Sequence, residues 1–190
     1  MVSSPKLFKN ETKFNVLDSS TLLSLIKTKG IVEPLEPELL SCNGLDLRLA
    51  NDYVRLRKTG KIFDTHGKNS LDRYFLAEKN PNLLIGPNEK VLVCTIERLR
   101  MPKNVMGLVG LRSTYSRLGL QMPLGFIDPG FVGQLTLEIS GGSFPVLLHL
   151  GDRVFHVVVA LLNGPSERSY DGKYQNQKGV TLPIFSGSKL

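Results

Sequence analysis

The side chains best suited to chemistry lie in one stretch, RSTYSRLGLQMPLGFIDPGFVGQLTLE, from Arg112 to Glu138. Arginines and hydroxyls gather at its start, and the carboxylates of Asp128 and Glu138 follow. Guanidinium and hydroxyl groups donate hydrogen bonds that suit phosphate oxygens. A well-placed carboxylate can accept a proton and then return it, as a general base and acid. The stretch therefore predicts a site for a phosphate-bearing ligand, with proton-transfer chemistry beside it.

The same residues also have purely structural interpretations. Glu138 could be a solvated charge on an outward strand face, since ionised carboxylates are normally exposed. Asp128 precedes a Pro-Gly pair and could simply initiate a turn. Arg112 and Arg117 could be surface charges, and Phe131 could be core packing. The pattern alone leaves both readings open.

Other catalytic signatures are absent from the sequence. It has no GxxxxGK[ST] loop, no GxGxxG and no HExxH motif, and the histidines His66, His149 and His156 are far apart. For the last two, which lie in strand patterns, we expect structural roles. Ser113 has no evident His and Asp partners, without which a hydroxyl is a weak nucleophile. The sequence therefore offers no hydrolytic triad.

The two cysteines, Cys42 and Cys94, have neither CxxC spacing nor a clustered histidine. A zinc site is therefore not expected. Both thiols are predicted to be reduced and buried.

An almost entirely β scaffold is expected to position the polar stretch. Short apolar runs broken by Pro, Gly, Asn and Asp are typical of strands. The candidates are residues 44–50, 52–56, 82–86, 90–96, 105–110, 133–139, 145–150 and 153–162. Within GQLTLEI at 133–139, leucines and isoleucine alternate with Gln134, Thr136 and Glu138, so these three should point off the core. Many strands at this spacing predict an all-β sandwich, jelly roll or distorted β-barrel.

One short helix is expected at residues 18–30, DSSTLLSLIKTKG. Asp18 or Ser19 can cap its first turn, and Gly30 can end it after two lysines that suit the C-terminal dipole. The polar run 57–72 should form a loop on the surface.

Length and composition predict a single domain over residues 1–190, with 1–15 as a flexible leader. The tail, 164–190, is polar and aromatic, and would fold over a ligand or a neighbouring subunit. The net charge of +7 is spread thinly, so a small phosphate-bearing ligand is favoured over nucleic acid. No apolar run is long enough to cross a membrane, and no signal-peptide pattern is present, so a cytoplasmic location is expected.

Several motifs together resemble the dCTP deaminase branch of the trimeric dUTPase superfamily. RSTYSRLGL at 112–120 is similar to its RSSxxRxGL motif, and GFIDPGFVGQLTLE at 125–138 to its Asp motif followed by the deaminase Glu. Further matches are NGLDLRL at 43–49, PNEKVLVCTIERLRMPKNVMGLV at 87–109 and KYQNQKGVTLP at 173–183. The resemblance spans about residues 17–185 in the right order, which makes it far more specific than any single motif.

The resemblance implies a dUTPase-like distorted β-barrel, a homotrimer, and active sites shared between subunits that bind dCTP or dUTP with Mg²⁺. Mg²⁺ would be held through the triphosphate, with no protein ligand and no zinc. Asp128 would sit against the sugar and the catalytic water, and Phe131 would stack on the deoxyribose. The implied nucleotide-binding residues are Arg112, Ser113, Thr114, Arg117, Asp128, Phe131, Thr136, Leu137, Glu138, Tyr170, Lys173 and Gln177.

The implied reaction is the zinc-independent hydrolytic deamination of dCTP to dUTP and ammonia. Glu138 would take a proton from the water that attacks C4 of cytosine and then deliver it to the ring and the departing ammonia. Other nucleobase deaminases use zinc to activate this water.

Other functions on the same scaffold are a dUTP diphosphatase, in which Asp128 orients water toward the α-phosphate, and a bifunctional enzyme that yields dUMP and pyrophosphate. A non-catalytic nucleotide-binding regulator is the alternative from another class. The tail lacks the Gly-rich motif of dUTPases, which favours the deaminase. Where bacterial deaminases carry a Thr-Ala pair before the Asp, this chain has residues 122–125, MPLG, so base preference depends on this linker.

Overall fold

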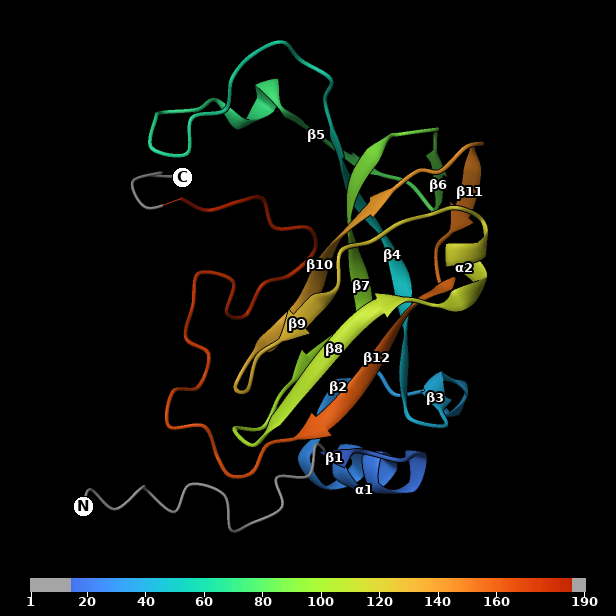
Figure 1. Cartoon of the computed structure of the whole chain (residues 1–190), viewed down its shortest axis with the longest axis vertical. Coiled ribbons are helices and arrows are strands. Elements are labelled where there is room, and N and C mark those ends of the chain that lie inside the picture. The colour runs from blue at the N-terminus through green and yellow to red at the C-terminus, as the bar shows by residue number, and fades with distance from the viewer. Residues whose placement is uncertain (1–14, 186–190) are drawn as a thin grey trace, which may run out of the picture.

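Apolar runs punctuated by turn residues form strands along most of the chain. The computed structural model describes residues 15–185, and in this part the main sheet has ten strands while a second sheet has two (Figure 1). The strands are β1 (Asn15–Val16), β2 (Val32–Glu33), β3 (Leu40–Ser41), β4 (Gly44–Leu56), β5 (Phe75–Lys79), β6 (Asn82–Ile85), β7 (Lys90–Arg100), β8 (Val105–Leu111), β9 (Gly125–Ile127), β10 (Val132–Ser140), β11 (Val146–His149) and β12 (Arg153–Leu161). Helical turns are α1 (Ser19–Lys29), η1 (Pro37–Leu39), η2 (Leu71–Arg73) and α2 (Ser113–Arg117).

The main sheet runs in the order β10-β7-β4-β12-β8-β9, and its strand pairings are antiparallel. β6 and β11 form the separate pair. The sheet curls, so that β9 and β10, at the two ends of this order, lie side by side in Figure 1. The expected all-β, distorted-barrel fold is therefore confirmed.

Residues 44–50 and 52–56, expected as two strands, form the single long strand β4. Its pairing with β7 shifts register between Leu49 and Tyr53, which lets one strand bend across the sheet. The Asn-Asp pair that suggested a break lies inside this irregular stretch. The dipeptide strands β1, β2 and β3 and the edge strands β5 and β9 were missed by the pattern, because short strands are defined by their partners.

Helix α1 forms as the sequence predicts. Asp18 is its N-cap and accepts hydrogen bonds from the backbone N–H groups of Ser20 and Thr21, and Gly30 closes the other end with φ of 59°. Leu22 and Ile26 are buried against the core, at the end of the barrel where β1 and β12 meet. The expected leader lies outside the described residues except for Asn15, which begins β1.

The cysteines differ from each other. Cys94 on β7 is buried, and burial raises the pKa of its thiol to about 11, so it is a poor nucleophile. Cys42 is exposed, which makes the prediction of burial wrong for this residue. It occupies the tight turn between β3 and β4, where its side chain faces solvent.

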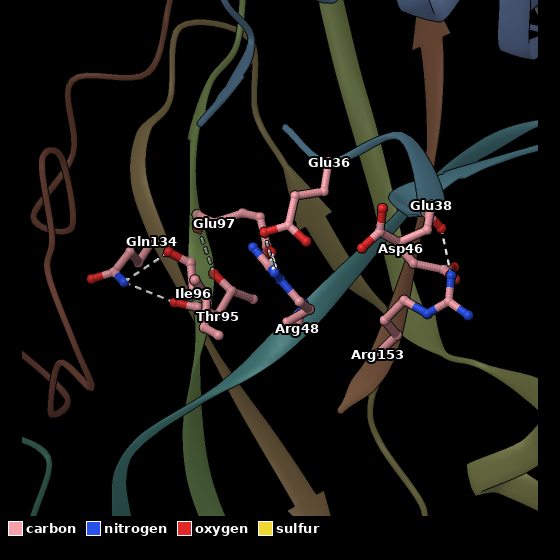
Figure 2. Close-up of polar contacts among 9 residues, drawn as sticks. All are labelled: Glu36, Glu38, Asp46, Arg48, Thr95, Ile96, Glu97, Gln134 and Arg153. Carbon is pink, nitrogen blue, oxygen red and sulfur yellow. Dashed lines mark hydrogen bonds and ion pairs between the residues drawn. The ribbon is translucent and has the colours of Figure 1, made fainter. Parts of the chain in front are cut away.

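Two carboxylates on the barrel strands are buried, and each is paired with arginine. Glu97 is fully buried and accepts hydrogen bonds from Arg48 at Nε (2.6 Å) and at the backbone N–H (2.7 Å), while Arg48 also reaches Glu36 (Figure 2). Asp46, which lies on strand β4 together with Arg48, accepts a hydrogen bond from Arg112 Nε at 3.0 Å. Among the described residues, every buried side-chain nitrogen and oxygen has a partner. The barrel therefore tolerates these charges through complete pairing.

Within residues 15–185, no helix has the length and apolar character needed to span a membrane.

Candidate active site

A pocket of about 410 Å³ opens where the two ends of the curled sheet meet the C-terminal tail. Strands β9 and β10 form its walls, and the chain that joins them carries Asp128. The pocket is lined by Leu92, Val109, Gly125, Phe126, Ile127, Asp128, Phe131, Leu135, Thr136, Leu137, Tyr170, Tyr174, Gln177, Thr181 and Pro183. Apolar walls with a few polar groups are typical of small-molecule sites.

Half of the sequence-predicted site residues come together in this pocket. They are Asp128, Phe131, Thr136, Leu137, Tyr170 and Gln177. Asp128 is exposed, whereas Phe131 is buried and meets Tyr170 edge to face, with ring centroids 5.7 Å apart. Phe131 therefore combines the two readings of the sequence, because it packs in the barrel and also lines the pocket.

Glu138 does not line the pocket but lies at its edge. Its neighbour Leu137 and its cross-strand partner Leu92 both form the wall. The carboxylate accepts hydrogen bonds from Lys90 Nζ at 2.7 Å and from Ser140 Oγ at 3.3 Å, and its side chain is 26% exposed. Buried and half-buried residues alternate along β10, so Glu138 points off the core as the pattern predicts.

The linker from Gln121 to Gly125 is positioned beside Glu138. Gln121 exchanges two backbone hydrogen bonds with Ser140, whose hydroxyl also reaches Glu138. The linker then enters β9 at Gly125, where a Cβ atom would lie only 2.5 Å from Cγ1 of Val109. Only glycine allows this close strand pairing, which brings the next residue, the exposed Phe126, to the pocket.

The tail packs against the outward face of β10. The hydroxyl of Thr136 accepts from the backbone N–H of Thr181 at 3.0 Å and donates to the carbonyl of Gly179 at 3.4 Å. Thr136, expected to face a base, therefore already bonds to the tail. Gln177 is joined to β10 by a parallel bridge at Gly133. The tail thus becomes one wall of the pocket within its own chain.

The predicted phosphate-binding residues lie elsewhere. Arg112, Ser113, Thr114 and Arg117 belong to α2 and its N-cap, which do not line the pocket. In Figure 1, α2 lies beside β11, on the opposite side of the barrel from the tail. Lys173, in the tail, also stays outside the pocket, and its ammonium group donates to the carbonyl of Ile184 at 3.0 Å.

Arg112 is held by an ion-pair cluster on the barrel. Asp46 is buried and accepts from Arg112 Nε and from His156 Nδ1, each at 3.0 Å. Arg112 Nη1 also donates to the carbonyl of Arg153 at 3.1 Å. His156 therefore has a structural partner, and His149 has one in Asn82, at 2.8 Å. Asp46 was missed because nothing in NGLDLRL shows that it meets Arg112 across β12.

Several pocket residues were not singled out as ligand contacts from the sequence. Phe126, Tyr174, Thr181 and Pro183 line the pocket. The last three come from the polar, aromatic tail, whose composition was the available signal. No group of three or more His, Cys, Asp or Glu side chains among residues 15–185 is placed to hold a metal ion.

Comparisons with known proteins show the fold and the family of this chain. A crystal structure of 2′-deoxycytidine 5′-triphosphate deaminase from Agrobacterium tumefaciens is similar, with a TM-score of 0.64 at 20% identity, over 78% of this chain and 48% of that one. This likeness shows a shared β-barrel fold. A family model described as "dCTP deaminase-like" matches residues 16–162. This chain is therefore a member of that family.

Two relatives with curated names match most of this chain. A protein named dCTP deaminase from Sulfurisphaera tokodaii is 45% identical over 81% of this chain and 83% of its own length. A protein named probable deoxyuridine 5′-triphosphate nucleotidohydrolase, from Sulfolobus islandicus rod-shaped virus 1, is 36% identical over 88% of this chain and 97% of its own length.

Proposed function

We propose that this protein is a dCTP deaminase, a hydrolase that converts dCTP and water to dUTP and ammonia. The observation that carries the proposal is Glu138 at the rim of the pocket that also holds Asp128, in a chain of the dCTP deaminase-like family. The name of the Sulfurisphaera tokodaii relative supports this activity.

In the proposed reaction, water adds to C4 of the cytosine ring while Glu138 removes its proton. Glu138 delivers this proton to N3 of the ring, and then takes the proton of the new C4 hydroxyl and passes it to the amino group. The C4–N4 bond breaks, ammonia leaves, and the C4 oxygen remains as the carbonyl of uracil. Lys90 and Ser140 hold the Glu138 carboxylate before substrate arrives. Lys90 must share or release this carboxylate when Glu138 turns to the base, and a flexible lysine with a 54% exposed side chain can do so.

The sugar would lie between Asp128 and Phe131. The exposed Asp128 carboxylate can accept a hydrogen bond from the 3′-hydroxyl or from the attacking water. The Phe131 ring, fixed by its edge contact with Tyr170, would leave no room for a 2′-hydroxyl. Thr136, Leu137 and Gln177 would border the base.

The triphosphate would be bound by Arg112, Ser113, Thr114, Arg117 and Lys173. These donors lie outside the pocket of their own chain, which supports a homotrimer in which α2 of one subunit completes the pocket of another. Mg²⁺ would arrive with the nucleotide, held by phosphate oxygens and water, the ligands this ion prefers. In this proposal the attacking water needs no zinc.

A second candidate activity is the hydrolysis of dUTP to dUMP and pyrophosphate, alone or after deamination. The name of the viral relative, which this chain matches over nearly all of that protein, favours it. Asp128 would then orient water toward the α-phosphate. Binding of nucleotide without turnover would indicate the regulator instead.

The deciding experiment is incubation with dCTP and, separately, with dUTP in the presence of Mg²⁺, followed by separation of the products. Ammonia with dUTP indicates the deaminase, ammonia with dUMP and pyrophosphate the bifunctional enzyme, and pyrophosphate from dUTP alone the diphosphatase. Glu138→Gln should abolish ammonia release and leave dCTP binding nearly unchanged. The control is Glu33→Gln, an exposed carboxylate on β2, which should keep full turnover. Full turnover by Glu138→Gln would rule out the mechanism.

A further inference from the structure

The side chain of Gln134 connects the barrel to the tail. From the outward face of β10, its Nε2 donates to the carbonyls of Thr95 (2.8 Å) and Ile96 (3.3 Å) on β7, as Figure 2 shows. Its Oε1 accepts from the backbone N–H of Gly179 at 2.7 Å. We propose that Gln134 is a positioning residue that holds the tail on the barrel and thereby keeps Gln177 at the pocket.

The carbonyls that Gln134 binds are available to its side chain because β7 bulges away from regular pairing with β10 at this point. Gln134 pairs with Arg98, but Thr136 pairs with Cys94, so β7 carries extra residues opposite Leu135. Thr95 and Ile96 therefore have no residue paired with them on β10, and buried carbonyls need a donor. The Thr95 hydroxyl meets the N–H of Leu135 at 3.0 Å, and the Gln134 amide meets the two carbonyls.

A carboxamide is required at this position. The group must donate toward β7 and accept from the tail at the same time, and only an amide of this length does both. Glutamate has the same shape but would place a charged oxygen against two carbonyls. Methionine has a similar length but no N–H to give.

The tail is ordered around this contact. The backbone N–H of Gln134 donates to the carbonyl of Gln177 at 3.1 Å, and Gln177 Nε2 returns a bond to the carbonyl of Gln134 at 2.6 Å. At Gly133 (φ 149°) a Cβ atom would lie 3.0 Å from the Gln177 carbonyl oxygen, so glycine permits this approach. Gln177, which lines the pocket, is therefore held between two contacts of the tail with β10. One is its close approach to Gly133, and the other is the hydrogen bond from the Gly179 N–H to Gln134.

The role in catalysis rests on the proposed function. If Gln177 and the tail contact the nucleotide, release of the tail weakens binding while Glu138 stays in place. We therefore expect the KM for dCTP to rise about tenfold in Gln134→Glu and Gln134→Met, the scale of a lost buried hydrogen bond, with a smaller change in kcat.

Tail opening can be measured without any activity, because trypsin cleaves after lysine and the Lys178–Gly179 bond contains the N–H that Gln134 holds. Trypsin is added under native conditions, and mass spectrometry follows the release of the peptide that begins at Gly179. The rate of this release reports opening at this bond. We expect this peptide to be released about tenfold faster from Gln134→Glu and Gln134→Met than from the wild type. The matched control is Arg98→Met, which removes the exposed hydrogen bond from Arg98 on β7 to Asn176 in the tail and should change the rate less than about twofold.

Cleavage at the wild-type rate in both variants would overturn the proposal, even if the variants were less stable, because Gln134 would then act only inside the barrel. Faster cleavage with an unchanged KM would confirm that Gln134 holds the tail and overturn its role in positioning Gln177. A wild-type protein with no turnover of dCTP would refute the proposed function, and the cleavage rates would still decide the role of Gln134.

Discussion

At the scale of single residues, motif and strand period predicted six of the side chains that line the pocket but not how the site residues are paired. Asp128, Thr136 and Gln177 line the pocket. The contact of Glu138 with Lys90 depends on the register between β7 and β10, which no local pattern encodes. The same holds for Asp46, whose partner Arg112 is distant in sequence.

Asp46→Asn tests whether this buried carboxylate orients Arg112. Asparagine keeps the shape but loses the charge that attracts Arg112 and His156, and it turns an NH₂ group toward one of these donors. We expect the free energy of unfolding to fall by about 1–3 kcal/mol, measured by urea denaturation, and the KM for dCTP to rise. Asp64→Asn, in the exposed polar loop, is the control and should change stability by less than about 0.5 kcal/mol. Unchanged stability and KM in Asp46→Asn would contradict this role.

At the scale of elements, the sequence predicted the capped helix α1 and most of the longer strands, although it divided β4 into two. Helix α1 follows from its capping residues, and β10 and β12 from their periods. The bulge in β7 was not predictable, because Thr95 and Glu97 look like outward-facing strand residues until Arg48 is seen beside Glu97. The tail was expected to cover a ligand, but the side chains that dock it, Gln134 and Thr136, appeared only in the structure.

The cap of α1 gives a pH-dependent prediction. Hydrogen bonds from the Ser20 hydroxyl and from the Thr21 and Ser20 backbone lower the pKa of Asp18 from its ordinary 3.8 to about 2. A lowered folded-state pKa means that the ionised cap stabilises the fold above about pH 4 and that this stabilisation is lost as the pH falls toward 2. In thermal melts, Asp18→Ala should be less stable than the wild type at neutral pH, and the difference should shrink between about pH 4 and pH 2. A difference independent of pH would show that the charge of the cap contributes nothing.

At the scale of the whole molecule, the two halves of the proposed site lie apart within one chain. The pocket lies at β9, β10 and the tail, whereas helix α2, which Arg112 caps and Arg117 ends, lies on the other side of the barrel in Figure 1. The family resemblance predicted active sites shared between subunits, and a distribution of this kind is what such sharing requires. The sequence motifs carry both halves but do not show whether one chain brings them together, since a motif records order along the chain only.

Mixing two inactive variants tests this arrangement. Arg112→Ala should lack triphosphate binding, and Glu138→Gln should lack proton transfer, so each homotrimer alone should release almost no ammonia from dCTP. If α2 of one subunit completes the pocket of the next, trimers reassembled from equal amounts of both variants contain some sites with Arg112 and Glu138 intact. Random assembly gives such a pair in about a quarter of the sites, and ammonia release should recover to about that fraction of the wild-type rate. Mixed samples that stay inactive, although mass measurement shows hybrid trimers, would place Arg112 and Glu138 in a site within one chain.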